Sequence, residues 1–508
     1  MRKLCFAAYM LSTLFVAAQK KSDPTPFAKT ISADDLKKHL YIVAGKEMEG
    51  RETATPGQKK AAAYIESQFQ SLGLIPGNNG NYQMKYPVYQ DSLIGTSVQV
   101  NEKTFELDKD FTVSVAQSSS STFRFSEIVF VGAGTVDSTR DDYKGLDVRG
   151  KVVLLLPPQG QTQQQGQRGG FGNQFARIDA AQKNGAVAVL VIGSGFPRQQ
   201  KTNPKGNMYL SSFQKIVRLN QFQVSENIAR AIMGDDYDKA KAGTLPPKTY
   251  TANVMLSFNK TTTDLQSSDV LGLLEGTDLK DEYVFITAHY DHLGKRNDSV
   301  IYYGADDDGS GTVSVLEMAE AFVKAKQAGN GPRRSIVFMT VSGEEKGLWG
   351  SQYYTNNPVF PLEKTTVDLN IDMIGRTDSS RHVGDSLNYV YVVGDDKISS
   401  DLKPISESIN KKYTKLELDY KFNDPNDRNR IYFRSDHYNF ASKGVPIIFY
   451  YDGMLGADYH RPTDTPDKIN YTLMVKRAQL VFYTAWEMAN RDQMLKRDLK
   501  LEVPQRGF

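Results

Sequence analysis

Cysteine is almost absent from this chain of 508 residues, which has one, Cys5. Without further cysteines the chain has no disulfide framework and no thiolate metal site. An excess of charge is absent too, because 62 basic and 59 acidic residues give a net charge of +3, and no basic run is interleaved with aromatic residues. We therefore expect neither nucleic acid nor an anionic membrane as a main partner.

Long hydrophobic runs are also lacking, since no segment reaches the roughly 18 apolar residues of a membrane span. The apolar stretch Leu4–Ala18 is shorter, follows the basic head Met1–Lys3 and ends in small residues. This pattern is typical of a secretory signal peptide, so we expect residues 1–18 to be removed and the mature chain to begin at Gln19. An exported chain without cysteine is most typical of a bacterial periplasm or cell exterior. We expect a secreted or periplasmic protein.

The length and the 40% content of hydrophobic residues are enough for two domains. Helical spacing dominates from about residue 31 to 74, and short strands dominate from about 90 to 248. Within the second region, the glutamine- and glycine-rich residues 159–174 predict a surface loop. We expect one domain to be made of residues 19–93 and 251–508, with a smaller β-rich domain inserted at 94–250.

Strands alternate with helices in the part after about Thr251. Short apolar runs rich in Val, Ile, Tyr and Phe are separated by helical stretches such as TVSVLEMAEAFVKAK; the runs are EYVFITA, RSIVFMTVS, VDLNID, YVYVVG and VPIIFYY. They predict an α/β fold with a mixed, largely parallel sheet that helices cover on both faces. Ligands of such sheets collect beyond the carboxyl ends of the strands.

Six side chains suited to a metal centre lie at or near the ends of these segments: His289 in ITAHYDHLG, Asp307 in GADDDGSG, Glu344 and Glu345 in SGEEKGLWGS, Asp372 in NIDMIGR and His460 in DYHRPTDT. Hydrolysis by two bridged metal ions needs about this set: a histidine and a carboxylate for each ion, a carboxylate between the ions and a free carboxylate as base. Imidazole and carboxylate without thiolate suit zinc best. The sequence therefore predicts two zinc ions.

The same residue types also have simpler interpretations. Single histidines are usually surface residues or satisfied core residues, and we assign His39, His292 and His382 to that class. Three consecutive aspartates at 306–308 would, alone, be a solvated turn. Two neighbouring acids after an apolar strand, however, are costly to desolvate unless a cation is nearby. The order and context of all six groups favour the metal site.

From Ile31 to about Arg491 these motifs resemble a family of zinc exopeptidases that includes secreted aminopeptidases, glutamate carboxypeptidase II, glutaminyl cyclase and the transferrin receptor. In the inserted region, GLDVRGKVVLLLPP and AAQKNGAVAVLVIG are similar to a protease-associated domain. The resemblance implies the zinc-exopeptidase fold with that domain inserted.

The resemblance also implies how the metal ligands are shared. His289 and Asp372 would hold one zinc. Glu345 and His460 would hold the other. Asp307 would bridge the two.

Further roles follow from the same resemblance. Glu344 would be the general base, and Asp291 would orient the first histidine. Two tyrosines match positions that stabilise the oxyanion in different branches: Tyr459 in the carboxypeptidase branch and Tyr432 in small secreted aminopeptidases. Asp464 would have a supporting role.

The resemblance implies cleavage of peptides, and AHYDHLG with GADDDGSG and HRPTDT is similar to bacterial members that act as aminopeptidases. A carboxypeptidase is an alternative, because Arg428, Arg430 and Arg434 offer positive charge for a terminal carboxylate. A glutaminyl-peptide cyclase with a single zinc and an inactive receptor-like scaffold are two more. The complete set of five ligands argues against both.

Overall fold

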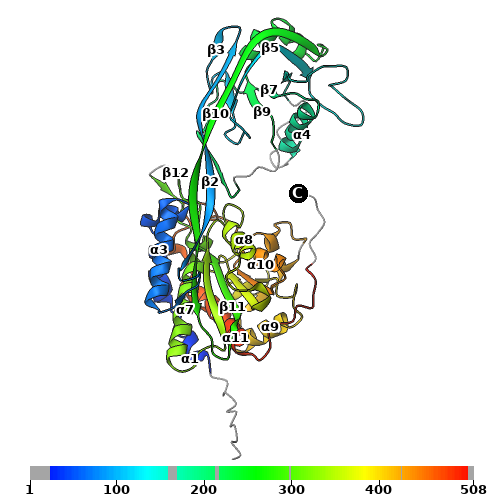
Figure 1. Cartoon of the computed structure of the whole chain (residues 1–508). Coiled ribbons are helices and arrows are strands. Elements are labelled where there is room, and N and C mark those ends of the chain that lie inside the picture. The colour runs from blue at the N-terminus through cyan, green and yellow to red at the C-terminus, as the bar shows by residue number, and fades with distance from the viewer. Residues whose placement is uncertain (1–22, 158–168, 212–216, 297–298, 425, 502–508) are drawn as a thin grey trace, which may run out of the picture. The chain divides into compact units, whose positions relative to one another are not determined.

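The chain folds into two units that are joined through two long strands. The computed structural model describes residues 23–157, 169–211, 217–296, 299–424 and 426–501 (Figure 1). Unit 1 consists of residues 1–85 and 267–508, and unit 2 of residues 86–266. The chain enters unit 2 within β2 (Gln83–Val100) and returns within β10 (Lys248–Leu274). The predicted signal peptide, residues 1–18, lies outside the described residues.

Unit 1 contains the mixed, largely parallel sheet that the sequence predicts. The strands follow the order β17 (Glu417–Asp419), β16 (Tyr389–Val393), β18 (Ile447–Tyr451), β15 (Thr365–Ile371), β11 (Leu279–His289), β14 (Arg334–Val341), β10. The last residues of β10 pair antiparallel with β14, and β16 pairs antiparallel with β18, whereas the other neighbours run parallel. The short strand β1 (Ile75–Pro76) pairs with β10, while β12 (Lys295–Arg296) and β13 (Val300–Ile301) pair with each other.

Successive residues of these strands pack into two different hydrophobic clusters, one on each face of the sheet. In β11, Val284 and Ile286 pack on one face and Phe285 on the other. Helices α1 (Thr25–Ala28), α2 (Ala33–Val43), α3 (Pro56–Ser71), α7 (Gly311–Gln327), α9 (Leu402–Lys412) and α11 (Tyr471–Asn490) contribute to the first cluster, and α8 (Trp349–Asn356) and α10 (His437–Ser442) to the second (Figure 1). Because both faces are buried, the strands read as continuous apolar runs.

The helices begin at residues that satisfy their first backbone amides or fit their first turn. The Ser32 side chain accepts a hydrogen bond from the backbone of Asp35, and the Asn470 side chain caps α11 in the same way. Pro56 stands at the first position of α3, where its missing N–H costs nothing. No helix in the described part of the chain combines the length and hydropathy needed to cross a bilayer.

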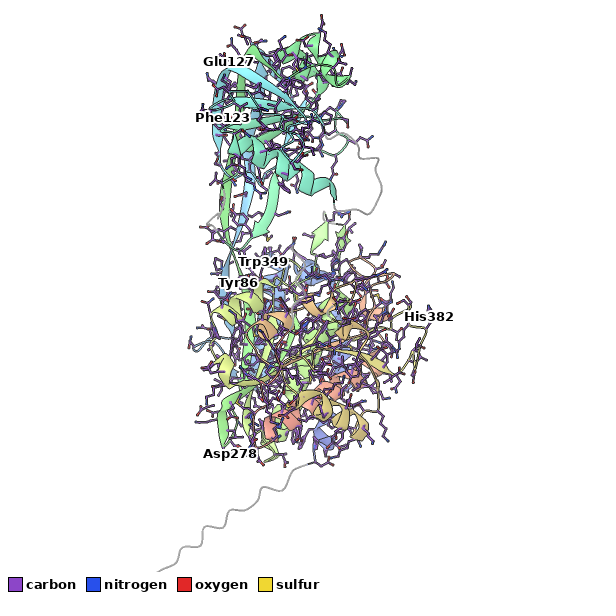
Figure 2. The ribbon with its side chains drawn as sticks, turned by 90° about the vertical axis from the view of Figure 1, so that its right-hand side faces the viewer. Tyr86, Phe123, Glu127, Asp278, Trp349 and His382 are labelled. Atoms are coloured by element: carbon purple, nitrogen blue, oxygen red, sulfur yellow. The ribbon has the colours of Figure 1, made fainter. Side chains whose placement is uncertain are left out.

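Unit 2 contains the strands that pair, directly or through one another, with the first part of β10, and hydrophobic clusters lie on both faces. The strands are β3 (Lys103–Phe105), β4 (Phe111–Val113), β5 (Ser121–Gly132), β6 (Val152–Leu155), β7 (Ala188–Ile192), β8 (Lys205–Tyr209) and β9 (Asn220–Val224), and the helices are α4 (Gly169–Lys183), α5 (Glu226–Met233) and α6 (Asp236–Lys241). The first part of β10 pairs antiparallel with β5, followed by the parallel neighbours β6, β7 and β9; Figure 2 shows Phe123 and Glu127 along β5.

Two details of this region differ from the sequence interpretation. The predicted loop at 159–174 is wrong for its second part, because α4 begins at Gly169; its first ten residues, 159–168, lie outside the described residues. The domain boundaries that we placed at 94 and 250 fall inside β2 and β10, and the units divide at 86 and 266.

Candidate metal centre

Four of the predicted site residues end or follow parallel, neighbouring strands of unit 1. His289 is the last residue of β11, Asp372 follows β15 directly, and Glu344 with Glu345 follows β14 after Ser342 and Gly343. Since β11 pairs in parallel with both β14 and β15, the carboxyl ends of these strands meet at one edge of the sheet. That edge is where open sheets of this kind bind their ligands.

Asp307 reaches the same edge from the turn Ala305–Ser310 that leads into α7. The Asp464 carboxylate holds this turn, because it accepts the backbone N–H groups of Asp306 at 3.0 Å and Asp307 at 3.2 Å. Gly304, which precedes the turn, has φ +57°, and a Cβ there would lie 2.5 Å from the ring of His292. The turn therefore needs glycine at this position.

The Asp307 carboxylate lies between two histidines. Its Oδ1 is 3.2 Å from Nε2 of His289, and its Oδ2 is 3.1 Å from Nε2 of His460. Asp372 Oδ1 lies 3.6 Å from the first of these nitrogens, and Glu345 Oε2 lies 3.1 Å from the second. Tetrahedral ligands at about 2.0–2.1 Å from zinc are roughly 3.3 Å apart, close to these separations. The five residues form two groups that share Asp307.

Two buried atoms at the centre of the cluster are Nε2 of His289 and Oδ2 of Asp307, and their contacts at 3.2 and 3.1 Å do not have hydrogen-bond geometry. Buried polar atoms without a partner are costly in free energy and call for a ligand. A cation coordinated by both groups would satisfy them. The donor set, imidazole and carboxylate, suits zinc.

The charges of the cluster also fit a cation. Burial lowers the pKa of His460, but Asp307 and Glu345 outweigh it and raise that pKa to about 10. Burial and Asp307 raise the pKa of Glu345, but the neighbouring imidazoles of His292 and His460 lower it to about 2. Protonated imidazole thus balances the carboxylates here. Divalent cations supply the same positive charge and leave the imidazoles neutral.

Glu344 stands beside these two groups without belonging to either. Its Oε2 is 3.9 Å from Nε2 of His289, and its backbone N–H donates to Oδ1 of Asp291 at 3.2 Å. Burial raises the pKa of the Glu344 carboxyl well above its usual value; His289 opposes this, and Asp372 adds to it. A carboxylate held next to the cluster but outside its ligand groups is suited to proton transfer.

Asp291 contacts the first histidine through its backbone. Nδ1 of His289 lies 3.1 Å from the Asp291 carbonyl oxygen and 3.7 Å from Oδ1 of its carboxylate. Oδ2 of that carboxylate accepts a hydrogen bond from the Thr53 hydroxyl at 2.7 Å. A carbonyl at Nδ1 favours the tautomer that leaves Nε2 free for a metal.

The two candidate tyrosines lie in different surroundings. The Tyr459 ring stacks on the ring of His460, with centroids 3.9 Å apart and planes at 20°. The Tyr459 hydroxyl accepts a hydrogen bond of 2.8 Å from Nη2 of Arg434. Tyr432 is 1% exposed and packs edge-on against Phe433 and His437.

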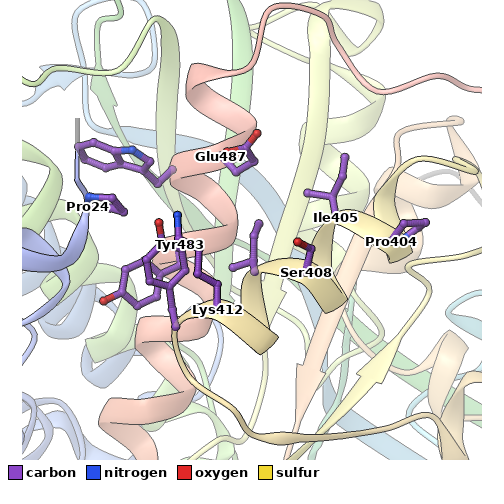
Figure 3. A pocket seen from close by; sticks show the side chains of 10 residues that line it. Pro24, Pro404, Ile405, Ser408, Lys412, Tyr483 and Glu487 are labelled. Atoms are coloured by element: carbon purple, nitrogen blue, oxygen red, sulfur yellow. The ribbon is translucent and has the colours of Figure 1, made fainter. Parts of the chain in front are cut away.

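A pocket opens beside the cluster, and Tyr459 lines it whereas Tyr432 does not. Its walls are Asp307, Glu344, Asp372, Met373, Ile431, Arg434, Phe449, Tyr451, Leu455 and Tyr459. A larger pocket lies between α9, α11 and Pro24 (Figure 3). No predicted site residue lines this larger pocket, so the pocket that belongs to the candidate metal centre is the smaller one beside the cluster.

Asp308 was not assigned from the sequence, although it lies close enough to His289 and Asp372 to form a third ligand with them. Its two carboxylate oxygens already accept the backbone N–H groups of His289, Gly311 and Met373. These three hydrogen bonds indicate that Asp308 stabilises the turn. Three consecutive aspartates gave no sequence signal that separates this role from that of a ligand.

His292 is a correction to the sequence interpretation. It is buried, and with Asp307 and Glu345 it forms a possible ligand group. Its Nδ1 is 2.8 Å from Oε1 of Glu345, closer than the roughly 3.3 Å between two zinc ligands. We therefore interpret His292 as a partner of the Glu345 carboxylate and keep His460 as the candidate ligand. The sequence feature that could have pointed to His292 is its place in AHYDHLG, directly after Asp291.

The other two histidines that we set aside lie outside the cluster. His382 is exposed at the margin of unit 1 (Figure 2). His39 is half-buried, and its Nδ1 lies 2.6 Å from the Tyr64 hydroxyl. Both placements agree with the surface and satisfied-core interpretation.

Residues 269–485 match the model of peptidase family M28. A probable leucine aminopeptidase of Arthroderma otae is 31% identical over 214 residues, which are 41% of this chain and 55% of that protein. Leupeptin-inactivating enzyme 1 of Streptomyces exfoliatus is 29% identical over 205 residues, 36% of this chain and 42% of that protein. The chain thus spans about half the length of the curated relatives that it matches.

The fold is shared along nearly the whole chain. An aminopeptidase from Aneurinibacillus sp. strain AM-1 has a TM-score of 0.53 at 19% identity, covering 96% of this chain and 99% of that one. A zinc aminopeptidase from Bacillus subtilis has a TM-score of 0.50 at 19% identity, covering 92% and 99%. The predicted resemblance to the zinc-exopeptidase family is confirmed for the region with the metal cluster.

Proposed function

We propose that this chain, whose residues 269–485 match peptidase family M28, is a metalloaminopeptidase that releases N-terminal residues from peptides with two zinc ions. One observation carries the proposal. The Asp307 carboxylate lies between the His289 and His460 imidazoles, each of which has a second carboxylate within 3.6 Å. Two ligand groups with a shared carboxylate are the arrangement of a co-catalytic pair.

In this proposal His289 and Asp372 would hold one zinc, Glu345 and His460 would hold the other, and both groups would share Asp307. Zinc bound there supplies Lewis acidity for the scissile carbonyl and lowers the pKa of a water. Glu344 accepts the proton of the attacking water and passes it to the leaving amine. Tyr459 lines the pocket, and its hydroxyl donates to the developing oxyanion.

Recognition of a free amine fits the same pocket. Its wall carries the carboxylates of Asp307, Glu344 and Asp372, which are suited to accept hydrogen bonds from an α-ammonium group. The apolar side chains of Met373, Ile431 and other lining residues would take the side chain of the first residue. The pocket also holds Arg434, which is why a carboxypeptidase is the alternative to be tested.

The fate of blocked peptides tests the polarity. The zinc-loaded protein is incubated with a pentapeptide, its N-acetyl copy and its C-amide copy, and the products are followed by mass. Acetylation removes the positive charge and donors of the amine, so it should abolish cleavage, whereas amidation should matter little. Loss of residues from the C-terminus would instead establish a carboxypeptidase, and cleavage of a doubly blocked peptide would exclude an exopeptidase.

We also propose that the protein acts outside the cytoplasm, after removal of residues 1–18. The support is the pattern of a basic head, an apolar stretch and small residues before Gln19. N-terminal sequencing of the protein exported by its host would test this: a mature chain that still begins at Met1 would contradict it.

A further inference from the structure

Three residues that line the pocket together with its acidic residues, Arg434, Tyr451 and Tyr459, are here called the donor wall. All three side chains end in groups that donate hydrogen bonds. Of the described residues that line this pocket, Arg434 alone carries a positive charge. The pocket therefore offers cation and hydroxyl groups in addition to the acids that suit an amine.

Arg434 differs in its partners from Arg334 and Arg381, two buried arginines of unit 1. The guanidinium groups of Arg334 and Arg381 pair with carboxylates of Glu282 and Glu417. Arg434 is exposed, and its guanidinium donates a hydrogen bond to the neutral Tyr459 hydroxyl. Within the described ranges of the chain, no carboxylate lies within ion-pair distance of it. The positive charge is thus available to a ligand in the pocket.

Tyr451 adds a second indication of a missing acceptor. It is 2% exposed, its ring lines the pocket, and its hydroxyl has no hydrogen-bond partner. A buried hydroxyl normally has a partner, so an oxygen acceptor bound in the pocket would satisfy it. A carboxylate has two oxygens that accept such bonds and a charge that matches Arg434.

We infer that Arg434 and Tyr451 of the donor wall bind a substrate carboxylate one residue beyond the scissile bond, which makes dipeptides the preferred substrates. The inference rests on the proposed aminopeptidase function. Arg434 bonds to the hydroxyl of Tyr459, the group assigned to the oxyanion, so its charge lies one hydrogen bond from the scissile carbonyl. Consecutive Cα atoms are about 3.8 Å apart, so the terminal carboxylate of a dipeptide, one residue beyond the scissile bond, can reach the Arg434 guanidinium. The terminal carboxylate of a pentapeptide lies four residues beyond that bond and does not reach it.

The test compares Leu-Ala with Leu-Ala-amide on the zinc-loaded full chain. Because a hydrogen bond to a charged group contributes about 1.5–3 kcal/mol, kcat/KM should be at least about tenfold higher for the free acid. In Arg434→Gln the ratio of the two kcat/KM values should fall close to one. The ratio is the readout, since Arg434 also contacts Tyr459 and its loss affects both substrates. Arg428→Gln, which removes the same charge from the same loop outside the pocket, should keep the parent ratio.

Further peptides separate the two sources of a carboxylate. A higher kcat/KM for Leu-Asp-amide than for Leu-Ala-amide would show that a side-chain carboxylate also binds, and for a pentapeptide amidation should change little. Equal values for Leu-Ala and its amide, or a ratio that Arg434→Gln leaves unchanged, would overturn the inference while leaving the aminopeptidase intact. Release of leucine from none of these peptides would overturn the proposed function and this inference with it.

Discussion

At the scale of residues, the centre separates two adjacent glutamates by what each one contacts. Glu345 places Oε2 3.1 Å from His460 and Oε1 2.8 Å from His292, whereas Glu344 has its nearest imidazole contact at 3.9 Å, to His289. Neutralising a side chain in a ligand position should weaken zinc binding. Neutralising a side chain beside the cluster should leave zinc binding intact. The two glutamates can therefore be told apart by experiment.

Glu344→Gln should keep the zinc content of the parent and lower kcat by about 10² to 10⁴, because an amide cannot accept the proton of the attacking water. Glu345→Gln should lose zinc, since the amide removes a charge from one ligand group. Metal analysis and kinetics on the same preparations check both. If Glu344→Gln lost metal and Glu345→Gln kept it, the assignment of base and ligand would be reversed.

The sequence predicted the five candidate ligands because each lies in a short motif at a strand end or turn, and the structure brings these five residues together. It did not predict His292 or Asp308. His292 is three residues from His289, and spacing alone does not show that the chain turns back beside Glu345. Asp308 differs from Asp307 only in which backbone amides it meets, and the fold of the turn decides that.

At the scale of elements, α7 contains a buried acid that the proposed chemistry does not use. Glu317 is 2% exposed and lies 3.5 Å from Nε2 of His39 on α2. Burial, with smaller effects of Glu320 and Asp35, raises the pKa of Glu317 from 4.5 to about 8. Burial also lowers the pKa of His39, so this imidazole is neutral above pH 6.5. The carboxyl of Glu317 is therefore protonated in the folded protein at neutral pH.

This predicts a fall in stability with rising pH. Between its unfolded pKa of 4.5 and its folded pKa of about 8, Glu317 keeps a proton in the folded state that the unfolded chain releases, so the free energy of unfolding decreases as pH rises. Glu317→Gln cannot ionise and should lack this contribution. Thermal unfolding from about pH 6 to about pH 9 should show the Tm of the parent falling relative to Glu317→Gln. Glu320→Gln, one turn along the same helix, should still show the fall in Tm, because burial is the main cause of the raised pKa of Glu317; a constant difference between Glu317→Gln and the parent would contradict the prediction.

The elements of unit 1 could be predicted because strands buried on both faces give short apolar runs, as in β11, β14 and β15. β10 was not predicted as one strand of 27 residues. Its residues 248–271 contain neither glycine nor proline, a signal against a break that we did not use. The start of α4 at Gly169 was missed because glycine and glutamine favour a loop locally, and helix propensity is only a weak guide.

At the scale of the whole molecule, all the candidate ligands and the pocket belong to unit 1. The family model covers residues 269–485, within that unit, and the solved structures share the fold over most of the chain. The alternation of strands and helices after residue 251 predicted this fold class. The division of the chain at 86 and 266 was not predictable from composition, because it falls within two continuous strands.

The central claim is that Asp307 joins two metal positions, and the zinc content of the active protein tests it most directly. The protein is stripped with a chelator and titrated with zinc, and bound zinc per chain and peptide hydrolysis are measured on the same samples. We predict that activity is lost with the metal and returns fully only near two zinc ions per chain. Full activity with one tightly bound zinc would contradict the account and favour a single-metal site.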